Sequence, residues 1–124
     1  MAAKHISKSE FLQNVWNYEE SPNEWKFLGK RPAVIDFYAT WCGACGAIDS
    51  ALNRVVLAMG DMVTLVRIDT TSRSSFDLVR KYNIVALPTL MLFRRGEVLW
   101  RECGVITYER LAHVIHRHHA AALY

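Results

Sequence analysis

A short apolar run, a cysteine pair and an amphipathic segment follow one another directly between residues 33 and 60. The run Ala33–Tyr38 has the length and composition of a buried strand, although it contains one acid, Asp36. After the cysteines, apolar residues recur at helical spacing up to Gly60, which is typical of a helix end. A second apolar run covers residues 62–68. A strand, a helix and a strand within about 35 residues predict two parallel strands joined by a right-handed crossover.

The remaining elements follow from capping residues, turn residues and periodicity. Ser7 and Glu10 have the spacing of a capping box, which predicts a first helix. The elements expected outside the crossover unit are helices over about 8–17 and 72–82, a helical turn over 23–29, strands over 89–93 and 97–102, and a last helix capped by Thr107. The residues expected to face the core from the helices are Ile48, Leu52, Val55, Val56, Met59, Phe76, Val79, Tyr82, Leu111, Val114 and Ile115.

This order of elements describes an α/β protein in which a mixed sheet of four to five strands carries helices on both faces. The length of 124 residues fits one domain over 1–124, and we expect a monomer. The formal charge of +3 comes from basic residues spread along the chain. Because a nucleic-acid-binding protein normally shows a basic stripe, we expect no nucleic-acid partner.

The expected compartment depends on whether the sequence shows a signal peptide or a membrane-spanning run. The start of the chain has no apolar core of a signal peptide, and no apolar run reaches the roughly 18 residues of a membrane-spanning helix. We therefore expect no membrane insertion and a cytoplasmic protein, or a periplasmic or secreted one if the sequence is a mature form.

The cysteines indicate redox chemistry. Cys42 and Cys45 form a C-x-x-C pair between strand and helix, and Cys103 lies far away in sequence. The alternatives are a zinc site, which would need a second ligand pair, or two ordinary small residues. Only a thiolate attacks a disulfide, and a helix N-terminus favours the thiolate. We expect Cys42 to be the exposed attacking thiol and Cys45, one turn further in, to be the resolving thiol; Gly43 permits the tight start of the helix.

Three segments of the chain resemble thioredoxin, and the resemblance runs from about residue 32 to the end. They are V-I-D-F-Y-A-T-W-C-G-A-C, V-R-I-D and Y-N-I-V-A-L-P-T-L-M-L-F-R-R-G-E-V. The resemblance implies the thioredoxin fold and protein thiol–disulfide exchange, with a redox-active Cys42–Cys45 disulfide and no bound cofactor. The implied partners are proteins that contain disulfides, and a thioredoxin reductase or membrane thiol donor that returns electrons.

The resemblance also implies further site residues. Asp36 matches the family's buried acid, which exchanges protons with the resolving thiol, and burial should raise its pKa; the alternative is an acid that is merely hydrogen-bonded in the strand. Pro88 matches the cis-proline beside the disulfide, where the Leu87 backbone would pair with an extended substrate. The full set implied for substrate binding is Trp41, Gly43, Ala44, Leu87, Pro88 and Gly104.

The chain departs from the family at four positions. Ala44 replaces a proline between the cysteines and restores a backbone N–H donor, so we expect a reduction potential above that of ordinary thioredoxin. Gly46 replaces a basic residue, and Ser50 replaces a helix-kinking proline, which predicts a straighter helix. Leu65 stands where the family has a lysine beside the buried acid, so Asp36 is expected to be harder to ionise.

Other functions and weaker signals stay open at this level. The same chemistry run in reverse gives an oxidase or isomerase, and a partner-binding module with secondary redox activity is a different class. We expect Cys103 to be a buried core cysteine, with a regulatory thiol as the alternative. The histidines of the last helix, His113, His116, His118 and His119, are expected to be solvated and not to bind a metal. Trp16, Trp25 and Trp100 are expected to serve packing.

Overall fold

The computed structural model describes residues 4–5, 32–94 and 97–122. The helix expected over 8–17 and the turn expected over 23–29, with Trp16 and Trp25, lie outside these residues.

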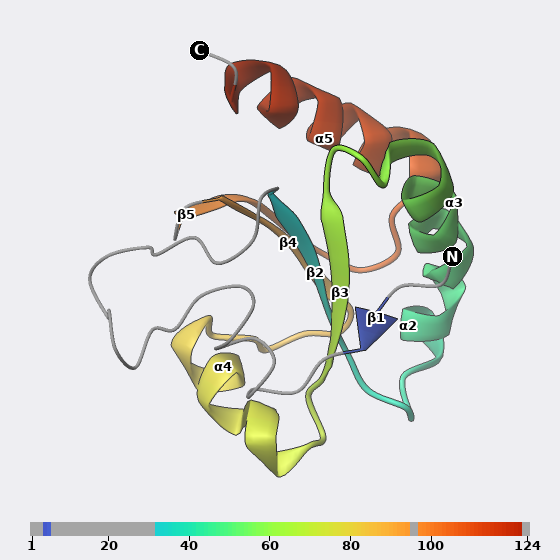
Figure 1. Cartoon of the computed structure of the whole chain (residues 1–124). Coiled ribbons are helices and arrows are strands. Elements are labelled where there is room, and N and C mark those ends of the chain that lie inside the picture. The colour runs from blue at the N-terminus through green and yellow to red at the C-terminus, as the bar shows by residue number, and fades with distance from the viewer. Residues whose placement is uncertain (1–3, 6–31, 95–96, 123–124) are drawn as a thin grey trace.

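A five-stranded mixed sheet forms the centre of the protein (Figure 1). The strands are arranged in the order β1-β3-β2-β4-β5; β1 pairs parallel with β3 and β3 parallel with β2, whereas β4 and β5 are antiparallel to their neighbours. The two-residue strand β1 was not expected from the sequence. The strands are β1 (Lys4–His5), β2 (Ala33–Tyr38), β3 (Thr64–Asp69), β4 (Thr89–Arg94) and β5 (Glu97–Cys103).

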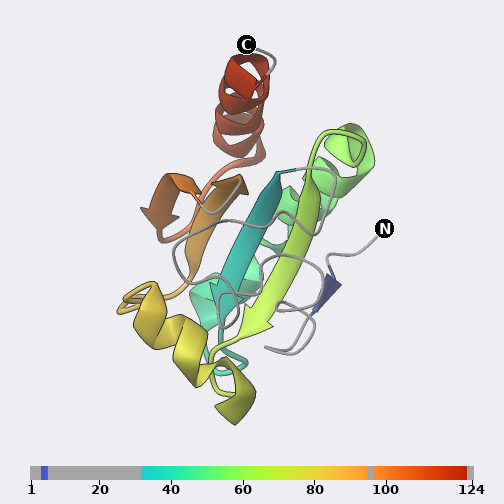
Figure 2. The same cartoon turned by 60° about the vertical axis from the view of Figure 1, so that its left-hand side comes forward.

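Helices cover both faces of the sheet, as the order of elements predicts (Figures 1 and 2). The helices α3 and α5 contact each other on one face, and α4 lies on the other. The helices are α2 (Gly43–Ala47), α3 (Asp49–Met59), α4 (Phe76–Lys81) and α5 (Tyr108–Ala122), and a 3₁₀ turn, η1 (Arg73–Ser75), precedes α4.

The alternation of side chains along β2 divides the core into two layers. Val34 packs with Leu52 and Leu111 of the helices α3 and α5. Ile35 and Phe37 point the other way, into a layer that contains Leu78 of α4. Because Asp36 is two residues after Val34, its side chain is on the α3 face.

The predicted helix after the cysteines is interrupted at Ile48, so the expectation of one straighter helix is wrong. Ile48 ends α2, is fully buried, and accepts the first backbone hydrogen bond of α3 from Leu52, at 3.0 Å. Two glycines, Gly43 and Gly46, weaken the helical preference of α2. An interruption therefore forms without a proline.

The inward face of α4 also differs from the prediction. Phe76 is 46% exposed, whereas Leu78 is fully buried and Val79 partly so. The segment begins as a 3₁₀ turn with about three residues per turn, which shifts the phase of the side chains relative to a continuous α-helix. In α5 the prediction is confirmed: Thr107 Oγ1 accepts the Arg110 N–H at 3.1 Å, and Leu111, Val114 and Ile115 are buried.

Helix α3 offers a matched pair of leucines that tests this packing. Leu52 is 1% exposed and Leu57 is 75% exposed. We expect Leu52→Ala to lower the free energy of unfolding by about 2–5 kcal/mol, because it leaves a cavity between sheet and helices. Leu57→Ala should change it by less than about 0.5 kcal/mol. Urea denaturation measures both, and equal effects would contradict the packing described here.

Candidate functional site

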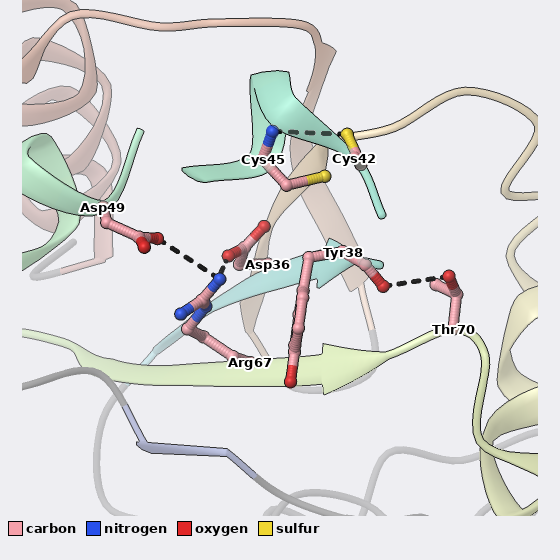
Figure 3. A network of polar contacts seen from close by, with 7 residues as sticks. All are labelled: Asp36, Tyr38, Cys42, Cys45, Asp49, Arg67 and Thr70. Atoms are coloured by element: carbon pink, nitrogen blue, oxygen red, sulfur yellow. Dashed lines mark hydrogen bonds and ion pairs between the residues drawn. The ribbon is translucent and has the colours of Figure 1, made fainter. Parts of the chain in front are cut away.

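Cys42 stands where the chain passes from β2 into α2, and it caps that helix (Figure 3). Its Sγ accepts the backbone N–H of Cys45 at 3.2 Å. The Cys42 side chain is partly exposed, whereas Cys45 is 1% exposed. Both are free thiols, so the structure describes the dithiol form. The arrangement of an outer and an inner thiol agrees with the prediction from the motif.

The inner thiol holds its proton at neutral pH. Burial raises the pKa of Cys45 to about 11, and a hydrogen bond with the Cys42 side chain and the nearby charge of Asp36 act in the same direction. A backbone hydrogen bond from Ala39 lowers the pKa, with a smaller effect than burial. Cys45 therefore needs a base before it can act as a nucleophile.

Asp36 supplies a carboxyl group in the interior below the cysteines (Figure 3). Its side chain is fully buried, and burial raises its pKa to about 6, although Arg67 acts to lower it. Oδ2 accepts a hydrogen bond from Arg67 Nε at 2.9 Å. Among the described residues, no hydrogen-bond donor reaches Oδ1. The acid is therefore buried, as predicted, with one oxygen held by an arginine.

The expectation that Asp36 lacks a neighbouring cation is wrong. Leu65, at the position of the family's lysine, is buried in the core layer of α3. Arg67, two residues later on β3, projects to the same face and is the direct cross-strand partner of Asp36. Strand periodicity in V-R-I-D could have revealed this arginine, since residues 65 and 67 share a face.

Pro88 lies at the start of β4, and the peptide bond between Leu87 and Pro88 is cis, as expected. The Pro88 carbonyl accepts the backbone N–H of Gly104 at 2.9 Å, and Gly104 has a φ of +96°, which favours glycine. The cis-proline loop and the turn after β5 are thereby joined.

Cys103 is exposed, so the expectation of a buried core cysteine is wrong. It faces Thr89 across the β4–β5 pair, with its Sγ 3.3 Å from the Thr89 hydroxyl oxygen. The strand β5 lies at the edge of the sheet and is only partly covered, which explains the exposure.

A shallow pocket adjoins the outer thiol. It brings together Trp41, Cys42 and Leu87 from the predicted set, and Trp41 is 74% exposed. Gly43 and Ala44 are exposed at the start of α2, next to Cys42. The sequence did not point to the other lining residues, which follow β3 or lie between Val79 and the cis-proline: Thr70, Val79, Ile84, Val85 and Ala86. Apart from Thr70 these lining residues have apolar side chains.

Within residues 4–5, 32–94 and 97–122, no group of three or more His, Cys, Asp or Glu side chains is arranged to hold a metal ion. His113 and His116 are exposed on α5. No helix in the same ranges is long and apolar enough to cross a membrane.

Comparison with known proteins gives consistent similarities. A family model described as Thioredoxin matches residues 5–117. Thioredoxin Y2, chloroplastic, of Arabidopsis thaliana is 41% identical over 81 residues, which are 65% of this chain and 47% of the plant protein. Thioredoxin of Bacillus subtilis is 32% identical over 85 residues, 68% of this chain and 80% of the bacterial one. The chain spans about half the length of the plant relatives it matches.

A solved structure supports the fold. The crystal structure of chloroplastic thioredoxin z superposes with a TM-score of 0.70, and the match covers 94% of each chain at 21% sequence identity. The thioredoxin fold expected from the sequence is thus confirmed.

The buried acid predicts how stability depends on pH. Because folding raises the pKa of Asp36 from 3.8 to about 6, the folded state binds this proton more tightly than the unfolded state between those values. The contribution of Asp36 therefore lowers stability as pH rises from about 4 to about 6, by about 3 kcal/mol at most. Asp36→Asn should remove this dependence of stability on pH, because an amide does not titrate in this range.

Urea denaturation of the dithiol form across this pH range measures the effect. Asp61→Asn, on an exposed turn, is the matched control and should keep the pH dependence of the parent. An Asp36→Asn variant whose stability follows the parent's pH curve would contradict the assignment of this buried charge.

Proposed function

Because this chain belongs to the thioredoxin family, we propose that it reduces disulfide bonds of proteins through Cys42 and Cys45. The observation that carries the proposal is the pairing of a partly exposed Cys42 Sγ, bonded to the N–H of Cys45, with a buried second thiol behind it. An outer nucleophile and an inner resolving group are what a two-step exchange requires. The pocket beside Cys42 gives a substrate room to approach.

The reaction proceeds in two steps. The Cys42 thiolate attacks one sulfur of the substrate disulfide, forms a mixed disulfide with it, and releases the other sulfur as a thiolate, which takes up a proton. Cys45 then attacks Cys42 Sγ, so that the Cys42–Cys45 disulfide forms and the second substrate sulfur leaves. Two electrons pass from the protein to the substrate. The exchange needs no bound cofactor, and a thioredoxin reductase or membrane thiol donor restores the dithiol.

Asp36 acts as the base for the second step. Its pKa of about 6 leaves the carboxyl mostly ionised at neutral pH, and Cys45 with a pKa of about 11 is mostly protonated. A proton acceptor below the inner thiol therefore lowers the barrier to its attack.

The substrate chain lies extended across the exposed indole of Trp41 and beside the cis-proline. In this arrangement the Leu87 backbone adds a strand-like pairing, and Pro88 and Gly104, joined by a backbone hydrogen bond, lie next to it in the chain fold. Gly43 and Ala44, exposed beside Cys42, contact the substrate from the helix side. Recognition depends mainly on backbone and apolar surface, so many sequences around a disulfide fit.

Cysteine substitutions test the function directly. Cys42→Ser should abolish insulin reduction with dithiothreitol as the electron source, because the attacking sulfur is lost. Cys45→Ser should capture substrates as mixed disulfides on Cys42. Cys103→Ser is the matched control and should retain the parent's activity. Turbidity of reduced insulin and non-reducing electrophoresis measure these outcomes. A parent protein no faster than dithiothreitol alone would refute the reductase function and favour a binding module.

A substitution at Ala44 tests whether the protein favours reduction of substrates or the reverse reaction of an oxidase or isomerase. Ala44 occupies the first turn of α2, where proline is tolerated, so Ala44→Pro removes the backbone donor without breaking the helix. If that donor stabilises the thiolate, the variant should have a reduction potential lower by about 30 mV. Equilibration with glutathione measures both proteins. An unchanged potential would remove the reason to consider an oxidase or isomerase.

A further inference from the structure

A partly buried arginine at the centre of the polar cluster below the cysteines is not explained by thiol exchange alone. Arg67 is 13% exposed and lies between two carboxyl groups (Figure 3). Its Nε is 2.9 Å from Asp36 Oδ2, and one of its terminal nitrogens is 3.2 Å from Asp49 Oδ1. Its guanidinium carbon is 4.3 Å from the centre of the Tyr38 ring. A charged group this far from solvent requires such partners.

Side chains from two elements, β2 and α3, contact the guanidinium that β3 supplies. Asp36 and Tyr38 project from β2 on the same face, and Asp36 is the direct cross-strand partner of Arg67. Asp49 approaches from the first turn of α3, immediately after the interruption at Ile48. Asp49 is the first residue of α3, so the residue that pairs with Arg67 directly follows the interruption.

The orientation of Asp36 follows from this contact. Arg67 holds one carboxyl oxygen, and the other, Oδ1, has no hydrogen-bond donor among the described residues. Figure 3 shows that Asp36 lies between Arg67 and Cys45, with its second oxygen turned away from the guanidinium and toward the cysteine side. Burial is the main cause of the raised pKa of Cys45, and the charge of Asp36 adds a smaller increase.

We propose that Arg67 is a positioning residue, held in place by Asp49, that keeps Asp36 ionised in the core and turns its second oxygen toward the thiol of Cys45. This inference rests on the proposed function. Leu65 stands at the position expected for the family's lysine, and Arg67 lies two residues further along β3 on the same face.

These groups account for each proton and electron pair that moves in the resolving step. With Cys42 in a mixed disulfide, the Asp36 carboxylate takes the proton from Cys45. The Cys45 electron pair forms the bond to Cys42 Sγ, the bond between Cys42 and the substrate sulfur breaks, and that sulfur leaves with the electron pair. The leaving thiolate takes up a proton from Asp36 or from water. Arg67 takes no part in this proton transfer.

An arginine fits this place better than a lysine. Its planar guanidinium offers several donors in fixed directions, so one nitrogen binds Asp36 while another binds Asp49, and the plane stacks on Tyr38. The ammonium of a lysine is a point charge and would serve the two carboxylates less well.

The first experiment follows the Asp36 side-chain carboxyl by NMR during a pH titration of the dithiol form. The groups that face it are Arg67 on β3, Asp49 on α3, Cys45 on α2 and Tyr38 on β2, which itself lies near Asp69. We expect Arg67→Gln to increase the proton affinity of Asp36 about tenfold or more, because the cation is lost. Arg67→Lys should bring the proton affinity of Asp36 part of the way back to that of the parent, because it restores a positive charge. Asp49→Asn should change the proton affinity of Asp36 by less than Arg67→Gln does.

Arg54→Gln is the matched control, since it removes one positive charge from an exposed site on α3. It should leave the Asp36 titration unchanged. An Arg67→Gln variant in which Asp36 titrates as in the parent would overturn the proposal. If Arg67→Gln does not fold, the comparison of Arg67→Lys with the parent decides in the same way: an identical Asp36 titration and an identical resolving rate would overturn it.

The second experiment measures the resolving step. Single-turnover reduction of a peptide disulfide is quenched with acid, and mass spectrometry follows the mixed disulfide on Cys42. In Arg67→Gln the mixed disulfide should persist about twofold longer than in the parent at about pH 7 and nearly tenfold longer at about pH 5, and the difference should disappear as pH rises further. In an Asp36→Asn background, Arg67→Gln should add no further delay. A delay independent of pH, or present without Asp36, would indicate a structural role and refute the proposal. A parent protein without reductase activity would refute the proposed function, while the NMR titration would still decide the role of Arg67.

Discussion

The placement of β2 at the centre of the sheet determines most of what the site contains. β2 is hydrogen-bonded to β3 on one side and to β4 on the other, and all its side chains are buried. Its end delivers Cys42 to the start of α2, its antiparallel neighbour begins at the cis-proline, and its parallel neighbour carries Arg67. Three separate parts of the chain therefore meet beside one strand, and the strand's alternation decides which side chains lie below the thiols.

A charged pair in this position is costly for stability. Well-packed apolar residues of similar size often stabilise a core as much as a buried ion pair or more, because two charges lose their hydration. The apolar runs of β2 and β4 show that this sheet readily accepts aliphatic side chains. Asp36 and Arg67 interrupt an otherwise apolar layer directly below the cysteines. Their location at the one place where proton transfer is useful favours a chemical reason for their presence over a structural one.

Local sequence patterns predicted the parts of the site that depend on neighbours in sequence. Strand β2, the capping position of Cys42 and the burial of Cys45 follow from a short run of residues, whereas the cis-proline was expected from the resemblance to thioredoxin. The counter-ion of Asp36 did not follow, because it lies 31 positions away on another strand and the expected residue, Leu65, is apolar. The predicted inward face of α4 was wrong because a 3₁₀ turn changes the phase of its side chains. The predicted burial of Cys103 was wrong because sequence alone does not show that its strand lies at the edge of the sheet.

The same distinction separates the two thiols. Cys42 depends on contacts within three residues, namely the N–H of Cys45 and the start of α2. Cys45 depends on contacts that the whole sheet assembles: a burial that raises its pKa and a carboxyl group that an arginine of β3 contacts. In the proposed reaction, changes within the motif therefore act first on the attack at the substrate disulfide, and changes around Arg67 act first on the release of the product.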